Sequence, residues 1–158
     1  MTSLDQIYRM HGHVVLRRAR RLLGNEDDAR EVLQELFASL VARSDAFAGR
    51  SSITTWLYGA TTNLCLNRLR DTKSRTQLLG ARYADATEAQ DPRAEALAAA
   101  RLLLARMPEA LAGVAVHYYI EEMTHEEIAE VLGCSRRHVG DLLVRVTEWL
   151  EAEEKNRC

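Results

Sequence analysis

The sequence predicts an all-α protein of two small helical domains joined by a flexible linker. Helix-favouring Ala, Leu, Arg and Glu are frequent, and the 158 residues include only 2 Pro and 8 Gly. Apolar residues recur every three or four positions over long stretches. Only the small, polar and acidic stretch GARYADATEAQDP lacks a sustained period. These observations divide the chain into residues 1–78, a linker at 79–92 and residues 93–158.

The front domain is predicted to begin with two helices. The first covers Leu4–Leu23 and ends at Gly24, a residue that tolerates the left-handed backbone of many helix ends. Asn25 can cap the second helix, in which apolar residues recur at helical spacing as far as Val41. Acidic residues at positions 26–28 suit the positive end of its dipole.

A third helix is predicted from Ile53, with either Ser51 or Ser52 as its cap. It is apolar as far as Leu69, and its end is basic. The cations of this end are Arg68, Arg70, Lys73 and Arg75. They are either the solvated end of a helix or a track for nucleic-acid phosphates.

The rear domain is predicted to open with an Ala- and Leu-rich helix from Arg93 to Arg106. Pro108 then suits the start of another helix, which runs as far as Tyr118. The stretch from Met123 to Leu150 closes the domain and has the pattern of a helix-turn-helix.

Both helix starts of this motif are marked. Thr124 and Glu127 form a capping box, Gly133 ends the first helix, and Ser135 can cap the second. The basic candidates for contacts with DNA bases are Arg136, Arg137, His138 and Arg145. A second helix that begins with basic residues suits the major groove, although the motif alone could also be an ordinary helical hairpin.

Charge is distributed unevenly along the chain, which has a net charge of −2. Residues 1–78 carry 12 basic and 8 acidic side chains, whereas residues 97–158 carry 7 basic and 11 acidic ones. In a nucleic-acid-binding protein of this composition, the front domain supplies most of the attraction for phosphates.

Several classes of protein are disfavoured by the sequence. His125 begins a zinc-protease-like HExxH pattern, but Ala129 stands where the second metal ligand is needed. The three cysteines are far apart, which indicates reduced thiols rather than a metal site. We therefore expect no enzyme activity, no cofactor and no metal. The absence of a signal peptide and of a membrane-spanning run predicts a cytoplasmic protein without membrane insertion.

Four segments resemble the extracytoplasmic-function (ECF) sigma factors of bacterial RNA polymerase. DDAREVLQELF (27–37) and FAGRSSITTWLYGATTNLCLNRLR (47–70) are similar to the family's promoter −10 domain. MPEALAGV (107–114) and the helix-turn-helix are similar to its promoter −35 domain. The segments appear in the family's order and spacing.

The resemblance implies roles for residues of the front domain. Its second helix would dock on the β′ clamp of core RNA polymerase through Asp28, Glu31, Gln34 and Glu35, although such a polar stripe is more often simply solvated. The loop containing Phe47, Arg50 and Ser51 would form a pocket for a flipped −10 base. The amide of Asn63 would bond a base edge, whereas Trp56, Leu57 and Tyr58 are more consistent with core packing.

The resemblance implies that the rear domain contacts the β flap of the polymerase and the −35 element of the promoter. It also implies an anti-sigma partner. The recognition helix departs from the family where it carries Gly140, Asp141, Leu142 and Thr147. The alternatives are a sigma-like regulator that acts through protein contacts with reduced −35 recognition, and a plain helix-turn-helix repressor. Promoter DNA and core polymerase are the expected partners.

Overall fold

The computed structural model describes residues 3–42, 52–79 and 92–156, and side chains in these ranges except at 72–79. The chain divides into two compact units, Met1–Arg106 and Met107–Cys158. Within the described residues, every regular element is a helix, as the sequence predicts. None of these helices has the length and apolar character needed to cross a membrane.

Unit 1 begins with helices α1 (Leu4–Leu23), α2 (Glu26–Ala42) and α3 (Ile53–Leu79). The predicted end at Gly24 is confirmed, because its φ is 69° and its N–H donates to the carbonyl of Arg20. Asn25 caps α2 by accepting a hydrogen bond from the N–H of Asp28 at 3.0 Å. Ser52 caps α3 by accepting one from the N–H of Thr55 at 3.1 Å.

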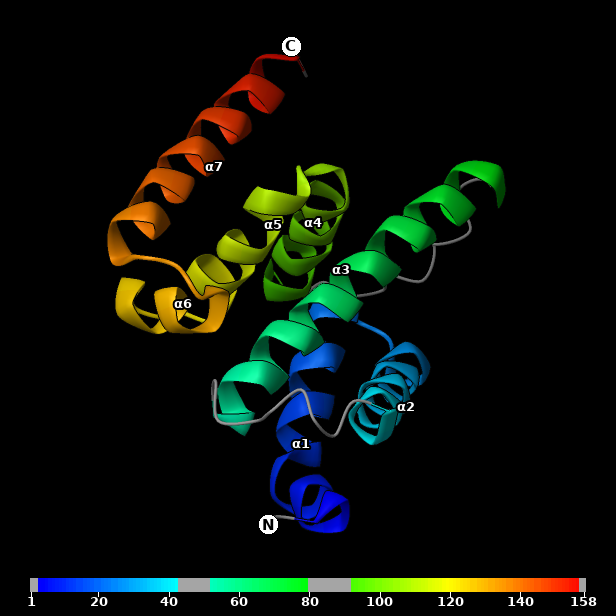
Figure 1. Cartoon of the computed structure of the whole chain (residues 1–158). Helices are drawn as coiled ribbons and strands as arrows, with labels where there is room; N and C mark the ends of the chain where they lie inside the picture. Colours follow the sequence, from blue (N-terminus) through cyan, green and yellow to red (C-terminus); the bar gives the residue numbers. More distant parts are fainter. Residues whose placement is uncertain (1–2, 43–51, 80–91, 157–158) are drawn as a thin grey trace. The chain divides into compact units, whose positions relative to one another are not determined.

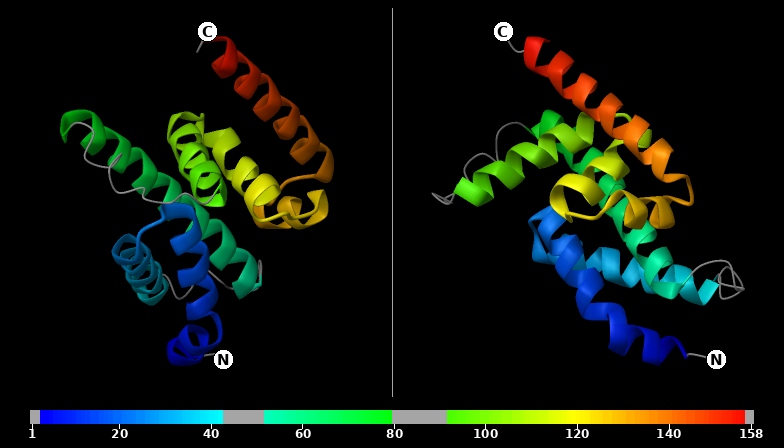
Figure 2. Two further views of the ribbon diagram at one scale, coloured as in Figure 1. Left: turned by 180° about the vertical axis from the view of Figure 1, so that it is seen from behind. Right: turned by 90° about the vertical axis from the view of Figure 1, so that its left-hand side faces the viewer.

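Helices α1, α2 and α3 pack against one another around one apolar core (Figures 1 and 2). The clearest periodicity of the sequence, that of α2, supplies most of this core. Its buried members are Val15, Leu33, Leu36, Phe37, Leu40 and Leu57. Tyr8 closes one end of the core, with its ring edge-on to that of Phe37 at 5.0 Å between centroids.

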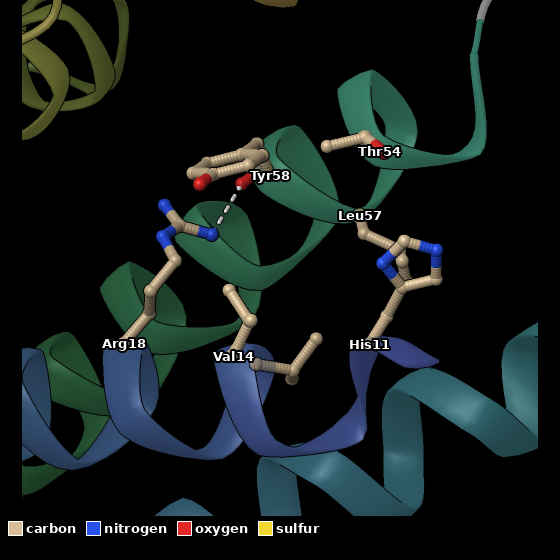
Figure 3. A pocket seen from close by; sticks show the side chains of 7 residues that line it. His11, Val14, Arg18, Thr54, Leu57 and Tyr58 are labelled. Carbon is tan, nitrogen blue, oxygen red and sulfur yellow. Dashed lines mark hydrogen bonds between the residues drawn. The ribbon is translucent and has the colours of Figure 1, made fainter. Parts of the chain in front are cut away.

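An arginine lies between α1 and α3 on the apolar side of α1 (Figure 3). Arg18 is only 8% exposed. Its guanidinium donates to the carbonyl of Tyr58 at 3.2 Å and to Oγ1 of Thr62 at 2.8 Å, and lies 4.3 Å from the centroid of the Tyr58 ring. These contacts compensate the burial of the charge and join α1 to α3. A small cavity beside them is lined by His11, Val14 and Thr54, among others.

Helix α4 (Pro92–Arg106) completes unit 1 by packing on α3 and the end of α1. Arg101 donates from Nε to the carbonyl of Leu22 and from Nη2 to the carbonyl of Arg21, both at 3.0 Å. Its guanidinium lies so close to Gly24 that a Cβ there would be 2.6 Å from Cζ of Arg101. We expected this helix to begin the rear domain, whereas its contacts in the structure are with the front one.

Unit 2 contains α5 (Glu109–Ala115), the π-helical turn η3 (Val116–Ile120), α6 (His125–Leu132) and α7 (Arg136–Asn156). The predicted capping box at Thr124 is confirmed, as is the left-handed Gly133, with φ 69°. Ser135 caps α7 by accepting a hydrogen bond from the N–H of His138. The core of the unit consists of Leu111, Val114, Val116, Ile128, Val139, Leu142, Leu143 and Val146, with other buried residues around them.

Candidate nucleic-acid and polymerase interface

One side of α2 carries the four residues expected to bind polymerase. Glu31, Gln34 and Glu35 are exposed, and Asp28 is partly so. Asp28 and Gln34 each lie three residues from Glu31, and Glu35 lies four residues from it, so the four share the face of α2 opposite its buried stripe. The structure therefore brings these residues together on one surface.

The carboxylates of this surface are not isolated from the basic end of α3. Arg68 forms ion pairs with Glu31 and, at 3.5 Å, with Glu35. Burial alone would lower the pKa of Arg68, but hydrogen bonds and charge from the two glutamates outweigh it and raise the pKa above the usual arginine value. Sequence spacing did not predict this contact, because it joins residues more than thirty positions apart.

Asn63 and Arg70 define a second surface on α3. Asn63 is exposed, and Arg70, seven residues further, lies two turns along the same side of the helix. The Arg70 guanidinium donates to Oδ1 of Asn67, between them, at 3.4 Å. Lys73 and Arg75 belong to the last turns of the same helix. An exposed amide, followed by basic residues, can bond a base edge and phosphates.

Two other groups of predicted residues complete the front domain. Phe47, Arg50 and Ser51 lie outside the described residues. Of the aromatic segment, Leu57 is buried in the core, as expected, whereas Trp56 and Tyr58 are partly exposed at its edge. Trp56 and Tyr58 thus combine packing with some access to a ligand.

The four basic candidates of the helix-turn-helix are not equivalent. Arg136 forms an ion pair with Glu126 of α6 at 3.0 Å, so part of its hydrogen-bonding capacity holds the two helices of the motif together. Arg137, His138 and Arg145 are exposed along α7. Sequence reasoning assigned Arg136 to DNA and overlooked Glu126, since their pairing depends on how the turn folds back.

The outward stripe of α7 contains more than basic residues. Arg137, Asp141, Val144 and Glu148 recur every three or four residues and are all exposed, with Val144 at 58%. Sequence reasoning noted Asp141 but missed Val144, whose signal is an apolar residue outside the buried stripe. In the major groove of DNA, this surface can offer the cation of Arg137 and the apolar side chain of Val144, but few contacts with phosphates.

No cluster of His, Cys, Asp and Glu able to hold a metal ion occurs among the residues that the structure describes. Cys65 is buried and Cys134 partly buried, both as free thiols.

Models of known protein families match both the front and the rear part of the chain. The model described as Sigma-70 region 2 matches residues 7–75, and the model described as Sigma-70, region 4 matches residues 97–148. Together they cover most of the chain, so the chain belongs to the sigma-70 family. The region 4 match starts inside α4, a helix that packs with unit 1.

Similar proteins indicate the branch of the family. The ECF RNA polymerase sigma factor SigE of Mycolicibacterium smegmatis is 33% identical over 84% of this chain, which spans about half (54%) of that protein. RNA polymerase sigma factor YlaC of Bacillus subtilis is 27% identical over 90% of this chain and 87% of its own length. Together with the two family models, these relatives identify the protein as an ECF-type sigma factor.

Two solved structures share the fold. CnrH, in complex with the cytosolic domain of CnrY, aligns with a TM-score of 0.57 and 21% identity over 98% of this chain and 89% of that one. RpoE of Bartonella quintana, in complex with the anti-sigma factor NepR, aligns with a TM-score of 0.54 and 16% identity over 98% of each chain. Both likenesses confirm the all-α architecture.

Proposed function

We propose that the protein divides the work of promoter recognition between its two units. Unit 1 docks on core RNA polymerase through α2 and holds the opened −10 element along α3. Unit 2 reads the −35 element through α7. The observation that carries this proposal is the match of the region 2 and region 4 models, in that order, to the two parts of the chain.

The docking surface is formed by Asp28, Glu31, Gln34 and Glu35. Its support is a polar face on a helix whose opposite face is fully used in the core. Carboxylates on such a face suit basic residues of a partner protein, because electrostatic complementarity speeds association and selects the partner. The polymerase β′ clamp is the partner that the family resemblance implies.

The −10 surface combines Asn63 with Arg70, Lys73 and Arg75, and we include Phe47, Arg50 and Ser51 as the wall of a base pocket. Support comes from the exposure of Asn63 and its placement on the same side of α3 as Arg70. An unstacked base needs a stacking surface and edge hydrogen bonds to offset the cost of leaving the duplex.

For the −35 element, we propose base contacts by Arg137 and His138, flanked by Arg145. Arg136 contributes by fixing α7 against α6 through Glu126, and its other donors remain candidates for DNA. The nearby Asp141 and Glu148 oppose phosphates, so this unit is expected to depend on polymerase for stable promoter binding.

The proposal also includes an anti-sigma partner and a place of action. The Bartonella quintana relative is bound to an anti-sigma factor in its solved structure, and we propose a partner of this kind for the present chain. RNA polymerase acts in the cytoplasm, where this chain would work as a binding subunit rather than as an enzyme.

Transcription in vitro tests the proposal. Core polymerase with the protein should produce transcripts from its cognate promoter. Asn63→Ala should make the free energy of open-complex formation less favourable by about 1–3 kcal/mol, the contribution of one base contact. Asn156→Ala, at the exposed end of α7, is the matched control. Core binding without transcription from mapped promoters would support the sigma-like regulator instead, and repression alone would support the plain repressor.

A further inference from the structure

Arg68 has a position that the DNA role expected from the sequence does not explain. Its side chain is 29% exposed and reaches from α3 to α2, where Nη1 bonds Oε2 of Glu31 and Nη2 bonds Oε2 of Glu35 at 3.5 Å. One guanidinium therefore bridges two carboxylates that lie one helical turn apart.

The two glutamates would be an unfavourable pair without this bridge. Like charges four residues apart on a helix repel each other. Arg68 cancels one of the two negative charges and holds both carboxylates by the oxygen Oε2. The second oxygen of each, Oε1, then has a defined position from which it can accept a hydrogen bond from another molecule.

Arg68 projects from a different side of α3 than Asn63 and Arg70, which belong to the proposed −10 surface. At 3.6 residues per turn, Arg68 lies about 140° around the helix from Asn63, whereas Arg70 lies within about 20° of it. A guanidinium committed to two carboxylates on α2 is not available to phosphates on the side of Asn63. The two neighbouring arginines thus serve different surfaces.

We propose that Arg68 is a positioning residue for polymerase docking. It presents Glu31 and Glu35 as a preformed acceptor for a guanidinium of core polymerase, which binds carboxylates through a planar fork of donors. This inference rests on the proposed docking role of α2. Preorganisation raises affinity because the side chains need not be ordered when the partner arrives.

The decisive variant is Arg68→Lys in the full chain, because it keeps the charge and removes the fork that spans both carboxylates. We expect its affinity for core polymerase, measured by fluorescence titration, to fall about 3- to 10-fold, mainly through faster dissociation. The matched control is Arg30→Lys, since Arg30 is exposed on α2 beside Glu31 and pairs with Glu26 instead. It should bind core polymerase as the wild type does.

Further variants separate positioning from a general role in packing. In a Glu31→Gln, Glu35→Gln background, Arg68→Lys should cause no additional loss of core affinity. The melting temperature of Arg68→Lys and its affinity for single-stranded −10 oligonucleotides should stay at the wild-type values. A loss that persists in the glutamine background, or that accompanies a lower melting temperature, would assign Arg68 to packing and overturn the proposal.

The outcomes also distinguish this inference from the docking proposal itself. If the two glutamate substitutions leave core affinity unchanged, the docking surface lies elsewhere on the molecule. If they weaken core binding while Arg68→Lys does not, α2 docks but Arg68 does not position its carboxylates. Stronger core binding by Arg68→Lys would mean that Arg68 competes with the polymerase for the glutamates, which also overturns the inference.

Discussion

Arg18 is a charged residue on the apolar side of a helix. It follows Val15 and precedes Ala19 and Leu22 at the spacing of buried positions, and all four are buried. Such burial is stable only because the guanidinium bonds the Tyr58 carbonyl and lies against the Tyr58 ring (Figure 3), and also bonds a hydroxyl of α3. Arg18 thereby fixes the position of α3 at the level of Tyr58, next to the proposed −10 surface.

Replacing Arg18 by Ala should destabilise unit 1 by about 2–4 kcal/mol, since it leaves a void and removes the donor from two buried acceptors. Urea unfolding followed by Trp56 fluorescence, with Trp149 replaced by Phe, measures this change. Arg17→Ala is the matched control, because Arg17 is the exposed neighbour on the same helix. Equal midpoints for both variants would show that the buried contacts of Arg18 add nothing to stability.

Helix ends are determined largely by a few side chains. Ser3 and Thr124 both form complete capping boxes, at the starts of α1 and α6. At Thr124, the backbone N–H donates to Oε1 of Glu127 at 3.0 Å. Hydrogen bonds from Thr124 lower the pKa of the Glu127 carboxyl below its usual value.

This lowered pKa predicts a pH-dependent contribution of Glu127 to the stability of unit 2. A carboxyl whose pKa is depressed by folding stabilises the protein above its unfolded pKa, and this stabilisation disappears as the pH falls through the folded pKa. The difference in melting temperature between wild type and Glu127→Gln should therefore be constant from pH 7 to about pH 5, decrease as the pH falls below the ordinary glutamate pKa of about 4.3, and vanish only below the lower folded pKa. A difference that does not decrease at all as the pH falls below about 4.3 would contradict the predicted origin.

The elements were predictable from the sequence because their signals are local. Gly24, Asn25, Thr124 and Gly133 act within one turn of their own helix, and the structure confirms each of them. The contacts of Arg68 with α2 and of Arg101 with α1 depend instead on how distant helices pack. Periodicity identifies which face is buried but not which helix covers it, so the sequence located α4 but did not show that it packs against α1 and α3. Arg18 was not singled out, because a charged residue on an apolar stripe shows nothing of the carbonyl, hydroxyl and ring that it contacts on α3.

At the scale of the whole molecule, α4 is the main departure from the predicted division. The family model assigns most of it to region 4, while its contacts place it with unit 1. Burial lowers the pKa of Arg101, and its hydrogen bonds cap carbonyls that α1 itself leaves unpaired. Unit 1 as folded thus contains part of the segment that follows the linker.

Two glycines with the same backbone conformation test this docking. Gly24 and Gly133 both have φ of 69°, but only at Gly24 would a Cβ meet another group, the guanidinium of Arg101. Gly24→Ala should therefore cost about 1–2 kcal/mol more than Gly133→Ala, because Arg101 must move and lose its two hydrogen bonds. Trp56 and Trp149 report the two units separately in urea unfolding.

An Arg101→Ala background provides the control for this comparison. There, Gly24→Ala should cost only what the left-handed conformation itself costs, about the same as Gly133→Ala. If the excess remains without the guanidinium, it arises from strain at the end of α1 rather than from the docking of α4.

The contact between Arg101 and the end of α1 also has a consequence for the order in which the chain folds. Arg101 and Leu22 are 79 residues apart in the sequence. Their contact therefore closes a long loop, and the loss of chain entropy on closure opposes its formation. Helices α1 and α2 are joined by a short turn and can associate early. Docking of α4 then belongs to the late steps, and interactions formed after the transition state slow unfolding more than they speed folding. We therefore expect the contacts of Arg101 to lower the unfolding rate of unit 1 and to have little effect on its folding rate.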